Sequence, residues 1–348
     1  MKAGKKTRKA ALAASISVPI LFVLCLFTFE AGSARAEFGW ADPENHNLAV
    51  TAAPDVLGDI QPSFHFKNAR YATGGVALRN QQKGTITLSG IPPGSTILSA
   101  QLYWAWASLK TPCTKHSSII FSRPIYSWPS PFFTYFSSVM YGTQVGTGAD
   151  PCWKGDYNFV YRADVTKQVT GSGVYGVSLV LGSAGSVDGS DPWVTVVPPL
   201  AEGAALVVVY SNSKEQMGEV NIYDRGLAGN MFVSAGLSYD LVGLPDGGIL
   251  SLWDTIGADG QVGHGRLAYA SIAQTTTTID GNLIAGPGSD YNDSDWNGSS
   301  GKPLPQLWDV HGHEVDLNIR GGSVNVTFSS TLDCLVPVAN VTLAFPPD

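Results

Sequence analysis

Two histidines and an aspartate in the stretch "LWDVHGHEVDL" have the spacing of a possible metal site. Asp309, His311 and His313 stand at positions i, i+2 and i+4, and a β-strand turns every second side chain to the same face. Imidazole and carboxylate groups that converge in this way bind zinc, copper or iron. Glu314 follows His313 directly and would face the opposite side. The alternative, which we prefer, is a polar-faced strand with a bulge at Gly312 and no metal.

A second candidate for metal binding precedes it, in "SDYNDSDWNGSS" at 289–300. Asp293, Asp295 and Asn297 alternate before Gly298, as oxygen ligands do in the first half of a calcium loop. The twelfth position of such a loop is Leu304 instead of glutamate, which excludes a full EF-hand. Calcium is therefore the candidate ion, and the alternative is a solvated turn, which Asn, Asp and Ser residues form readily.

Aromatic residues concentrate between 117 and 142, beside several prolines that oppose regular strand pairing. Exposed rings stack on sugars or contact proteins. The candidate binding residues are Tyr126, Trp128, Phe132, Phe133 and Tyr135. The alternative, which the sequence favours, is that this insertion folds back on the protein as a small core of its own.

The sequence offers little for catalysis. It contains no G-x-S-x-G and no H-E-x-x-H motif, which are the signatures of common hydrolases and metalloproteases. Carboxylates that could serve a glycosidase, which needs two facing a cleft, are Asp224, Asp246, Asp254, Asp259 and Glu314. The sequence does not show which of them face each other.

The elements that would position these residues are strands. Residues 85–88, 323–328 and 341–345 alternate apolar and polar side chains, which predicts antiparallel strands with one buried face. Residues 205–210 are apolar on both faces and predict a central strand. Glycine (39 residues) and proline (21 residues) punctuate short apolar runs, as in all-β secreted proteins. The predicted fold class is therefore all-β.

A weak internal repeat divides the chain. Residues 161–212 and 311–345 share the order of an acidic residue, a Gly-rich turn, an alternating strand and a final apolar strand. We predict two tandem antiparallel β-sandwiches of the jelly-roll type. They would cover 61–214, with the aromatic insertion 117–142, and 215–348, after an N-terminal linker at 37–60.

Five short motifs occur along the chain in a fixed order: "AQLYWAW" (100–106), "YRADVT" (161–166), "GSGVY" (171–175), "ALVVVY" (205–210) and "VNIYDRG" (220–226). With these motifs the chain resembles uncharacterised secreted β-sandwich proteins of bacteria and archaea. The resemblance implies a cell-surface or extracellular-matrix protein and no agreed activity. Arg225 interrupts the Asp-Gly turn that this family would have.

The N-terminus reads as a secretory signal. Basic residues precede an apolar run from Ala10 to Phe29, and small residues end at Ala36, which predicts cleavage there; the alternative is an uncleaved anchor. Removing 1–36 takes away six basic residues and one acidic residue, which leaves 15 basic and 27 acidic residues and a net charge of −12. Such a surface repels nucleic acid. We expect a secreted protein without a membrane span after cleavage.

Three cysteines remain after cleavage, and an oxidising compartment favours their pairing. Cys113 and Cys152 bracket the aromatic insertion, so we predict that they form a disulfide. Cys334 would then be a buried thiol or an intermolecular link.

The leading hypothesis is a secreted, non-enzymatic protein of the cell envelope or matrix. It would bind an extracellular glycan or a surface protein through the aromatic insertion and inter-strand loops. It would require no cofactor, and calcium would be its one candidate ion. The competing hypotheses are a carbohydrate-active hydrolase that uses two carboxylates and a metal enzyme at His311 and His313.

Overall fold

The computed structural model describes residues 54–347, apart from 110–112, 126–133, 151, 154, 193, 234–235, 261–274, 292–293, 299, 301–306 and 330–333. The predicted signal at 1–36 lies outside the described residues. Within them, regular structure consists of strands and two short 3₁₀ helices, η1 (Thr114–Ser117) and η2 (Thr166–Gln168). The all-β prediction is confirmed. No helix of the described residues has the length and hydropathy of a membrane span.

The first half of the chain supplies ten of the described strands. They are β1 (Asp55–Ile60), β2 (Phe64–Ala77), β3 (Lys83–Leu88), β4 (Thr96–Ser108), β5 (Ser118–Ile125), β6 (Thr134–Tyr141), β7 (Thr143–Ala149), β8 (Tyr157–Asp164), β9 (Gly173–Leu179) and β10 (Leu200–Ser211).

The second half supplies the others. They are β11 (Gly218–Tyr223), β12 (Phe232–Val233), β13 (Leu237–Val242), β14 (Ile249–Ala258), β15 (Thr276–Ile279), β16 (Asn282–Ala285), β17 (Trp308–Asn318), β18 (Ser323–Ser329) and β19 (Cys334–Phe345).

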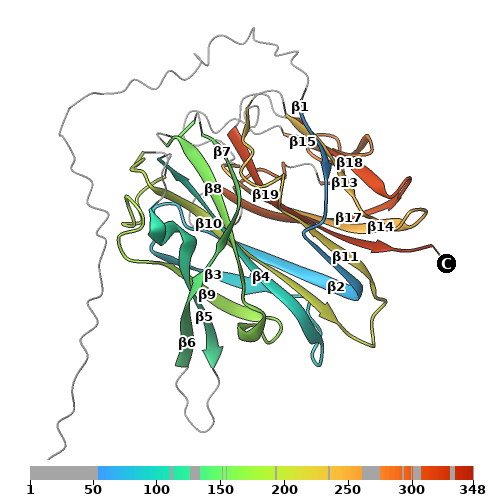
Figure 1. The fold of residues 1–348 in the computed structure, drawn as a ribbon, viewed down its shortest axis with the longest axis horizontal. Helices are drawn as coiled ribbons and strands as arrows, with labels where there is room; N and C mark the ends of the chain where they lie inside the picture. The colour runs from blue at the N-terminus through green and yellow to red at the C-terminus, as the bar shows by residue number, and fades with distance from the viewer. Residues whose placement is uncertain are drawn as a thin grey trace, which may run out of the picture. The chain divides into compact units, whose positions relative to one another are not determined.

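These strands form three sheets (Figure 1). A ten-stranded sheet runs in the order β17-β14-β19-β11-β2-β10-β4-β8-β7, and β12 pairs with β19. The smaller sheets run β3-β9-β5-β6 and β1-β13-β18-β15-β16. The pairs between the named strands are antiparallel except β1 with β13, which is parallel. Since β11 pairs with β2, strands of both halves share the large sheet.

Eight strands of each half occupy equivalent positions. In the large sheet β8-β4-β10-β2 corresponds to β17-β14-β19-β11, and in the smaller sheets β3-β9-β5-β6 corresponds to β13-β18-β15-β16. Corresponding strands also follow the same order along the chain. The weak repeat in the sequence therefore matches a repeated strand order, which maps β8, β9 and β10 onto β17, β18 and β19. This order is compatible with the predicted jelly-roll type.

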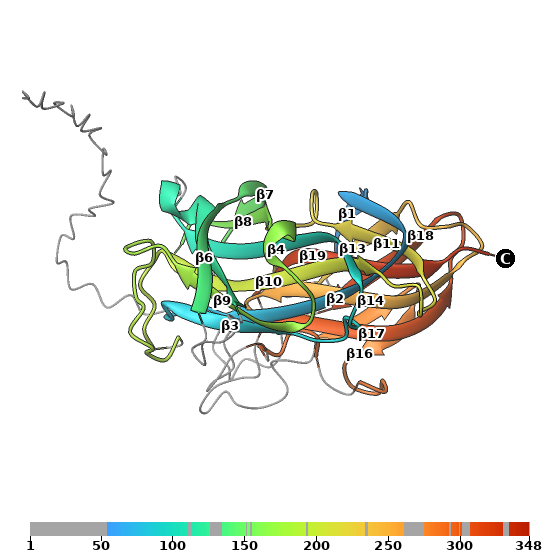
Figure 2. The same cartoon turned by 90° about the horizontal axis from the view of Figure 1, so that it is seen from below.

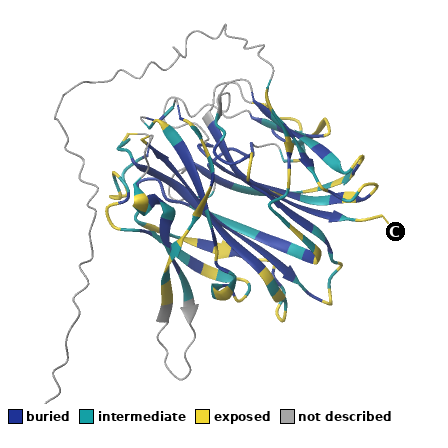
Figure 3. Cartoon of the chain, viewed as in Figure 1, coloured by how far each residue is buried: buried dark blue, intermediate teal, exposed yellow. Residues whose placement is uncertain are grey.

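Three clusters of buried apolar side chains pack between the sheets. Figure 2 shows the sheets from a second direction, and Figure 3 colours the buried residues dark blue. One cluster, with Trp104 and Phe121, joins the four-stranded sheet to the first-half end of the large sheet. Another, with Trp253 and Phe328, joins the five-stranded sheet to the second-half end. The remaining cluster contains strands of both halves and includes Trp308. The two ends of the large sheet therefore pack face to face.

This central contact is tight. A Cβ atom added at Gly203 of β10 would lie 2.3 Å from Cδ2 of Trp308 on β17, so glycine is required for the two strands to approach. The described residues of both halves belong to one compact unit. The predicted boundary between the two sandwiches, near 213–218, falls in the connection between β10 and β11, and both of these strands belong to the large sheet.

A fully buried ionic group also links the halves. Arg79 Nε donates to Glu202 Oε2 at 3.1 Å, and Arg79 Nη2 donates to Asp259 Oδ1 at 3.0 Å and to Glu202. The ring of Trp153 lies 4.4 Å from the guanidinium carbon. Arg79 and Glu202 belong to the first half and Asp259 to the second, so the group fastens one half to the other.

Part of the predicted linker at 37–60 is a strand. Asp55–Ile60 forms β1, parallel to β13. Its side chains are mostly exposed or half-buried, and only Ile60 is buried. An edge strand of this kind lacks the alternation that marks a half-buried strand, which explains why the sequence pattern missed it.

Candidate functional site

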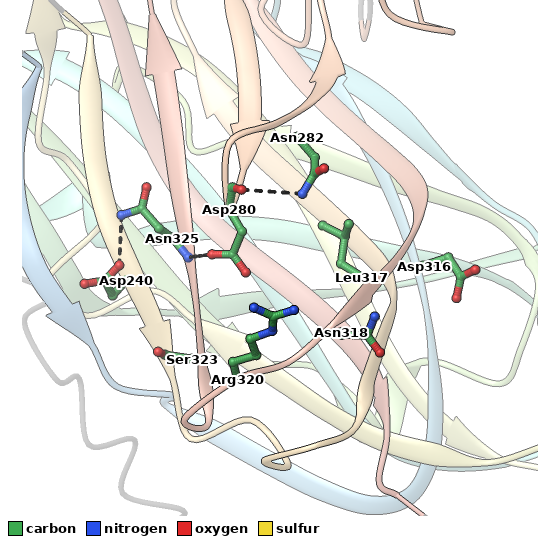
Figure 4. Close-up of a pocket in the computed structure, with 9 residues that line it drawn as sticks. All are labelled: Asp240, Asp280, Asn282, Asp316, Leu317, Asn318, Arg320, Ser323 and Asn325. Carbon is green, nitrogen blue, oxygen red and sulfur yellow. Dashed lines mark hydrogen bonds between the residues drawn. The ribbon is translucent and has the colours of Figure 1, made fainter.

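A polar pocket opens on the five-stranded sheet, with a cavity volume of about 590 Å³. Its lining residues are Asp240, Asp280, Asn282, Asp316, Leu317, Asn318, Arg320, Ser323 and Asn325 (Figure 4). Eight of the nine carry polar or charged side chains, and Leu317 is the apolar exception. The three carboxylates and one guanidinium give the lining a formal charge of −2.

The floor of the pocket comes from two paired strands. Asp240 of β13 stands opposite Asn325 of β18. Their chain neighbours Tyr239, Leu241 and Val324 are buried, so the alternation of each strand turns Asp240 and Asn325 outward. Asn325 Nδ2 donates to Asp240 Oδ1 at 2.8 Å, which holds both side chains in place.

One wall is the turn between β15 and β16. Asp280 has a φ of +48°, a left-handed conformation that Asp and Asn tolerate better than most residues. Its Oδ1 accepts a hydrogen bond from the backbone N–H of Asn325 at 2.7 Å. Asn282 Nδ2 donates to the carbonyl of Ile279 at 3.1 Å. The turn is therefore bonded to the sheet beside it.

The opposite wall is the end of β17 and the turn that follows. Asp316, Leu317 and Asn318 end the strand, and Arg320 forms an isolated bridge with Ser323. Figure 4 shows the guanidinium of Arg320 pointing into the group of side chains. The pocket thus presents carboxylate acceptors, amide groups that both donate and accept, and one cationic donor.

The sequence-predicted metal residues lie elsewhere and meet each other. His313 Nε2 lies 2.5 Å from Asp295 Oδ1, and His311 Nε2 lies 3.2 Å from Asn297 Oδ1 and 3.4 Å from Asp309 Oδ1. We call Asp295, Asn297, Asp309, His311 and His313 the histidine cluster. Asp309, His311 and His313 therefore share one face of β17, as predicted. Asp295 and Asn297 of the second candidate motif lie against this face, so described residues of both motifs belong to one cluster.

Polar contacts within the protein already connect the histidine cluster. Tyr291 Oη lies 3.1 Å from His311 Nδ1, and Thr277 Oγ1 donates to Asp295 Oδ2 at 2.7 Å. The ring of His313 stacks on Trp253 with centroids 5.9 Å apart. In the described part of the chain, no group of three or more His, Cys, Asp or Glu side chains is arranged to hold a metal ion.

The candidate calcium residue Asp293 lies outside the described residues, so the calcium and transition-metal sites both stay predictions. The bulge predicted at Gly312 is wrong. Gly312 pairs with Asp254 in regular register, and the irregularity lies nearer the end of β17, where three steps from Glu314 to Leu317 oppose two steps from Leu252 to Leu250. The extra residue therefore lies in β17 itself, between Glu314 and Leu317, where Asp316 has a φ of +47°. A bulge does not require glycine, so Gly312 did not locate it.

Near the histidine cluster, Asp254 of β14 has a carboxyl group with a raised pKa. Its Oδ1 accepts from Tyr71 Oη at 2.7 Å and its Oδ2 from Thr73 Oγ1 at 2.5 Å. Burial raises the pKa of Asp254 to about 6, although these two hydrogen bonds oppose the rise. A carboxyl group of this kind is partly protonated near neutral pH and could donate a proton.

The other carboxylates named above have structural partners or an exposed position. Asp224 accepts hydrogen bonds from Tyr103 Oη at 2.9 Å and from Arg162. Asp246 accepts from the backbone N–H of Gly321 at 2.7 Å, and Asp259 accepts from Arg79. Glu314 is exposed on β17.

The aromatic segment 117–142 is not an insertion into the sandwich. Its two ends are β5 and β6, a hairpin of the four-stranded sheet that corresponds to β15–β16 of the second half (Figure 1). Tyr126, Trp128, Phe132 and Phe133 lie outside the described residues. Tyr135 lies on β6, and its side chain is outside the described part. Phe136 and Tyr141 of β6 are exposed, at 47% and 77%.

Cys113 and Cys152 are both disulfide-bonded in the structure, and the described residues include no free cysteine. That these two bind each other stays a prediction. The side chain of Cys334 lies outside the described part.

The comparisons with known proteins give no family. No family model and no curated protein matches the sequence. Among solved structures, the chain is similar to a glycoside hydrolase in complex with neoagarooctaose, at 9% identity and a TM-score of 0.25, over 81% of this chain and 33% of that one. It is also similar to recombinant peptide:N-glycanase F, at 10% identity and a TM-score of 0.24, over 81% of this chain and 97% of that one.

The chain spans about a third of the first of these two proteins. Likenesses with TM-scores this low do not establish a shared fold or a shared function.

The sequence patterns missed the polar pocket. Its residues come from three separate stretches, around 240, 280–282 and 316–325, and none of those stretches resembles a known motif. The turn pairs Asp280-Gly281 and Gly321-Gly322 were the available signal, because such pairs mark tight turns. They locate turns in the sequence without showing that these turns border one cavity.

Proposed function

We propose that this is a secreted, non-enzymatic protein of the cell envelope or extracellular matrix that binds a glycan in the polar pocket. The proposal rests on one observation, which is the concentration of carboxylate, amide and guanidinium groups around a cavity of about 590 Å³. Small-molecule sites commonly have volumes of 300 to 1,000 Å³, so the cavity is large enough for one or a few sugar rings.

The chemistry of the lining suits hydroxyl groups. Each sugar hydroxyl is both a donor and an acceptor. The carboxylates of Asp240, Asp280 and Asp316 offer acceptors, whereas Arg320 and the asparagine amides offer donors. The formal charge of −2 opposes sulfated, phosphorylated or uronic sugars. The expected ligand is therefore a neutral or amino sugar.

The pocket is also partly preorganised. Asn325 binds Asp240 through its amide and Asp280 through its backbone N–H, so two carboxylates are oriented before a ligand arrives. Preorganised groups lose less entropy on binding, which preserves more of the interaction energy as affinity.

Isothermal titration calorimetry with a panel of neutral, amino and uronic oligosaccharides tests the proposal. We expect binding of a neutral or amino sugar, and we expect Asp240→Ala to weaken it at least tenfold. A tenfold loss is about 1.4 kcal/mol, and a hydrogen bond to a charged group contributes about 1.5–3 kcal/mol, so the loss of one such bond is enough. Asp55→Ala removes an exposed carboxylate from β1 and serves as the matched control.

Binding by no sugar of the panel, or equal binding by the two variants, would overturn the proposal.

A hydrolase remains the second candidate, because Asp254 has the raised pKa of a general acid. It predicts that incubating the protein with the same oligosaccharides releases new reducing ends, and that Asp254→Asn abolishes the release. Intact oligosaccharides after prolonged incubation would remove this candidate.

A further inference from the structure

We propose that the outer face of the four-stranded sheet is a second glycan contact, which binds the surface of an uncharged polysaccharide. This inference rests on the proposed glycan-binding function but assigns a different site from the polar pocket. It concerns the side chains of β3, β9, β5 and β6 that point away from the core.

The alternation of the four strands defines this face. Ile86, Tyr175 and Phe121 are buried beneath the sheet, so their chain neighbours point outward. We call the outward residues the neutral face: Lys83, Thr85, Thr87, Ile120, Ser122, Ser137, Val139, Tyr141, Val174, Gly176 and Ser178.

Strand register arranges these residues in cross-strand rows. One row runs from Thr85 through Gly176 and Ser122 to Ser137. It carries three hydroxyl groups and one position without a side chain.

The adjacent row runs from Lys83 through Ser178 and Ile120 to Val139, and it ends in two apolar residues. A hydroxyl row beside a partly apolar row matches a polysaccharide, whose chains present hydroxyl edges next to C–H faces.

The neutral face carries almost no charge. Lys83, at one corner, is its only charged residue, whereas about 25–35% of an ordinary soluble surface is charged. The whole chain has a net charge of −7, so its acidic side chains lie outside the neutral face. Binding an uncharged polymer here would require no desolvation of ionised groups, which makes a neutral partner the best match.

The described residues leave this face open. Tyr141, Val139 and Val174 are exposed at 77%, 47% and 46%. Strand β6 is an edge of its sheet and contains no charged residue and no proline in Thr134–Tyr141. Exposed edges usually carry such residues, which prevent aggregation. Their absence from the strand that carries the exposed ring of Tyr141 supports a contact surface.

The size of the face argues against a second copy of the chain as the occupant. Four strands about 4.8 Å apart and four rows about 6.8 Å apart cover roughly 14 Å by 20 Å between Cα atoms, or about 300 Å². A stable protein interface buries about 800 Å² on each partner. A polymer surface does not have this limit, because many protein molecules bind it side by side.

Retention on insoluble polysaccharides tests the inference. The protein is incubated with amorphous cellulose and with chitin, which are uncharged, and with chitosan and pectate, which are charged. We expect retention on at least one uncharged polymer. Retention should be unchanged in 0.5 M salt, because salt screens interactions between charges and the Debye length is already only about 10 Å at 0.1 M. Thr85→Glu and Ser137→Glu place charges at the two ends of the hydroxyl row, and each should lower retention at least tenfold.

Two controls make the result specific. Val56→Glu adds the same charge at an exposed position of β1, outside the face, and should bind as the unaltered protein does. Asp240→Ala disables the polar pocket and should also be retained. Thermal melting curves for all variants establish that they are folded.

Several outcomes would overturn the inference. These are no retention on any uncharged polymer, full retention of both glutamate variants, or loss of retention by Asp240→Ala, which would place the polymer in the pocket instead. Gel filtration that shows a dimer, dissociated by Ser137→Glu, would assign the face to a second copy. Sugar binding by calorimetry without polymer retention would reject this face and leave the proposed function intact.

Discussion

Glu202 offers the sharpest test of how the two halves are joined. Its carboxylate is fully buried against Arg79, and burial raises its pKa from 4.5 to about 7 because Arg79 offsets only part of the desolvation. Each pKa unit is worth about 1.4 kcal/mol, so the ionised side chain costs roughly 3 kcal/mol more than the neutral one on folding.

The direction with pH follows from the raised pKa. A group that holds its proton more tightly in the folded protein contributes stability below its unfolded pKa of 4.5, and this stability is lost as the pH rises through about 7. Glu202→Gln removes the charge at every pH and keeps an acceptor for Arg79. The variant should therefore match the unaltered protein near pH 4.5 and be more stable at pH 8, by up to roughly 3 kcal/mol.

Urea unfolding followed by tryptophan fluorescence at pH 5, 6, 7 and 8 gives the free energy of unfolding for both proteins. The pH dependence of Asp254, whose pKa is also raised, cancels in the difference between them. Glu219→Gln is the control, because Glu219 is a partly exposed carboxylate that pairs with Lys67. If Glu202→Gln were instead destabilising by the same amount at pH 5 and pH 8, the reasoning from desolvation would be refuted.

Three further changes test other parts of the structure. Gly257→Ala would place a Cβ 2.0 Å from Cζ3 of buried Trp296, so we expect a loss of about 1–3 kcal/mol and a lower melting temperature; an unchanged value would contradict this packing. Cys113→Ser should cost about 2–4 kcal/mol, and a reductant should lower the melting temperature of the unaltered protein but not of the variant. Calcium should leave the melting temperature unchanged, since Asp295 already contacts His313 and Thr277; a rise would indicate an occupied calcium site.

The strands could be predicted because their signal is local. Alternation over four to six residues indicates which face is buried, and it placed Val324, Val326 and Phe328 in the core, where the structure has them. Strand β1 was missed because only one of its six residues is buried. Local patterns detect burial, so they do not detect a strand that is joined mainly by backbone hydrogen bonds.

The candidate sites were predicted unevenly for a related reason. The alternation of Asp309, His311 and His313 correctly placed them on one side of β17, yet a metal site and a hydrogen-bonded network require the same spacing. The polar pocket depends on Asp240 meeting Asn325, 85 positions later in the chain. That contact follows from strand register between distant segments, which no short stretch of sequence encodes.

The pairing of β2 with β11 predicts what happens when the two halves are produced as separate polypeptides. A cut between 212 and 217 would give two fragments, each with an unpaired strand at its newly exposed border and an uncovered apolar surface. Neither fragment should stay dispersed in solution by itself. Produced together, they should recombine, because each supplies the backbone partners that the other lacks.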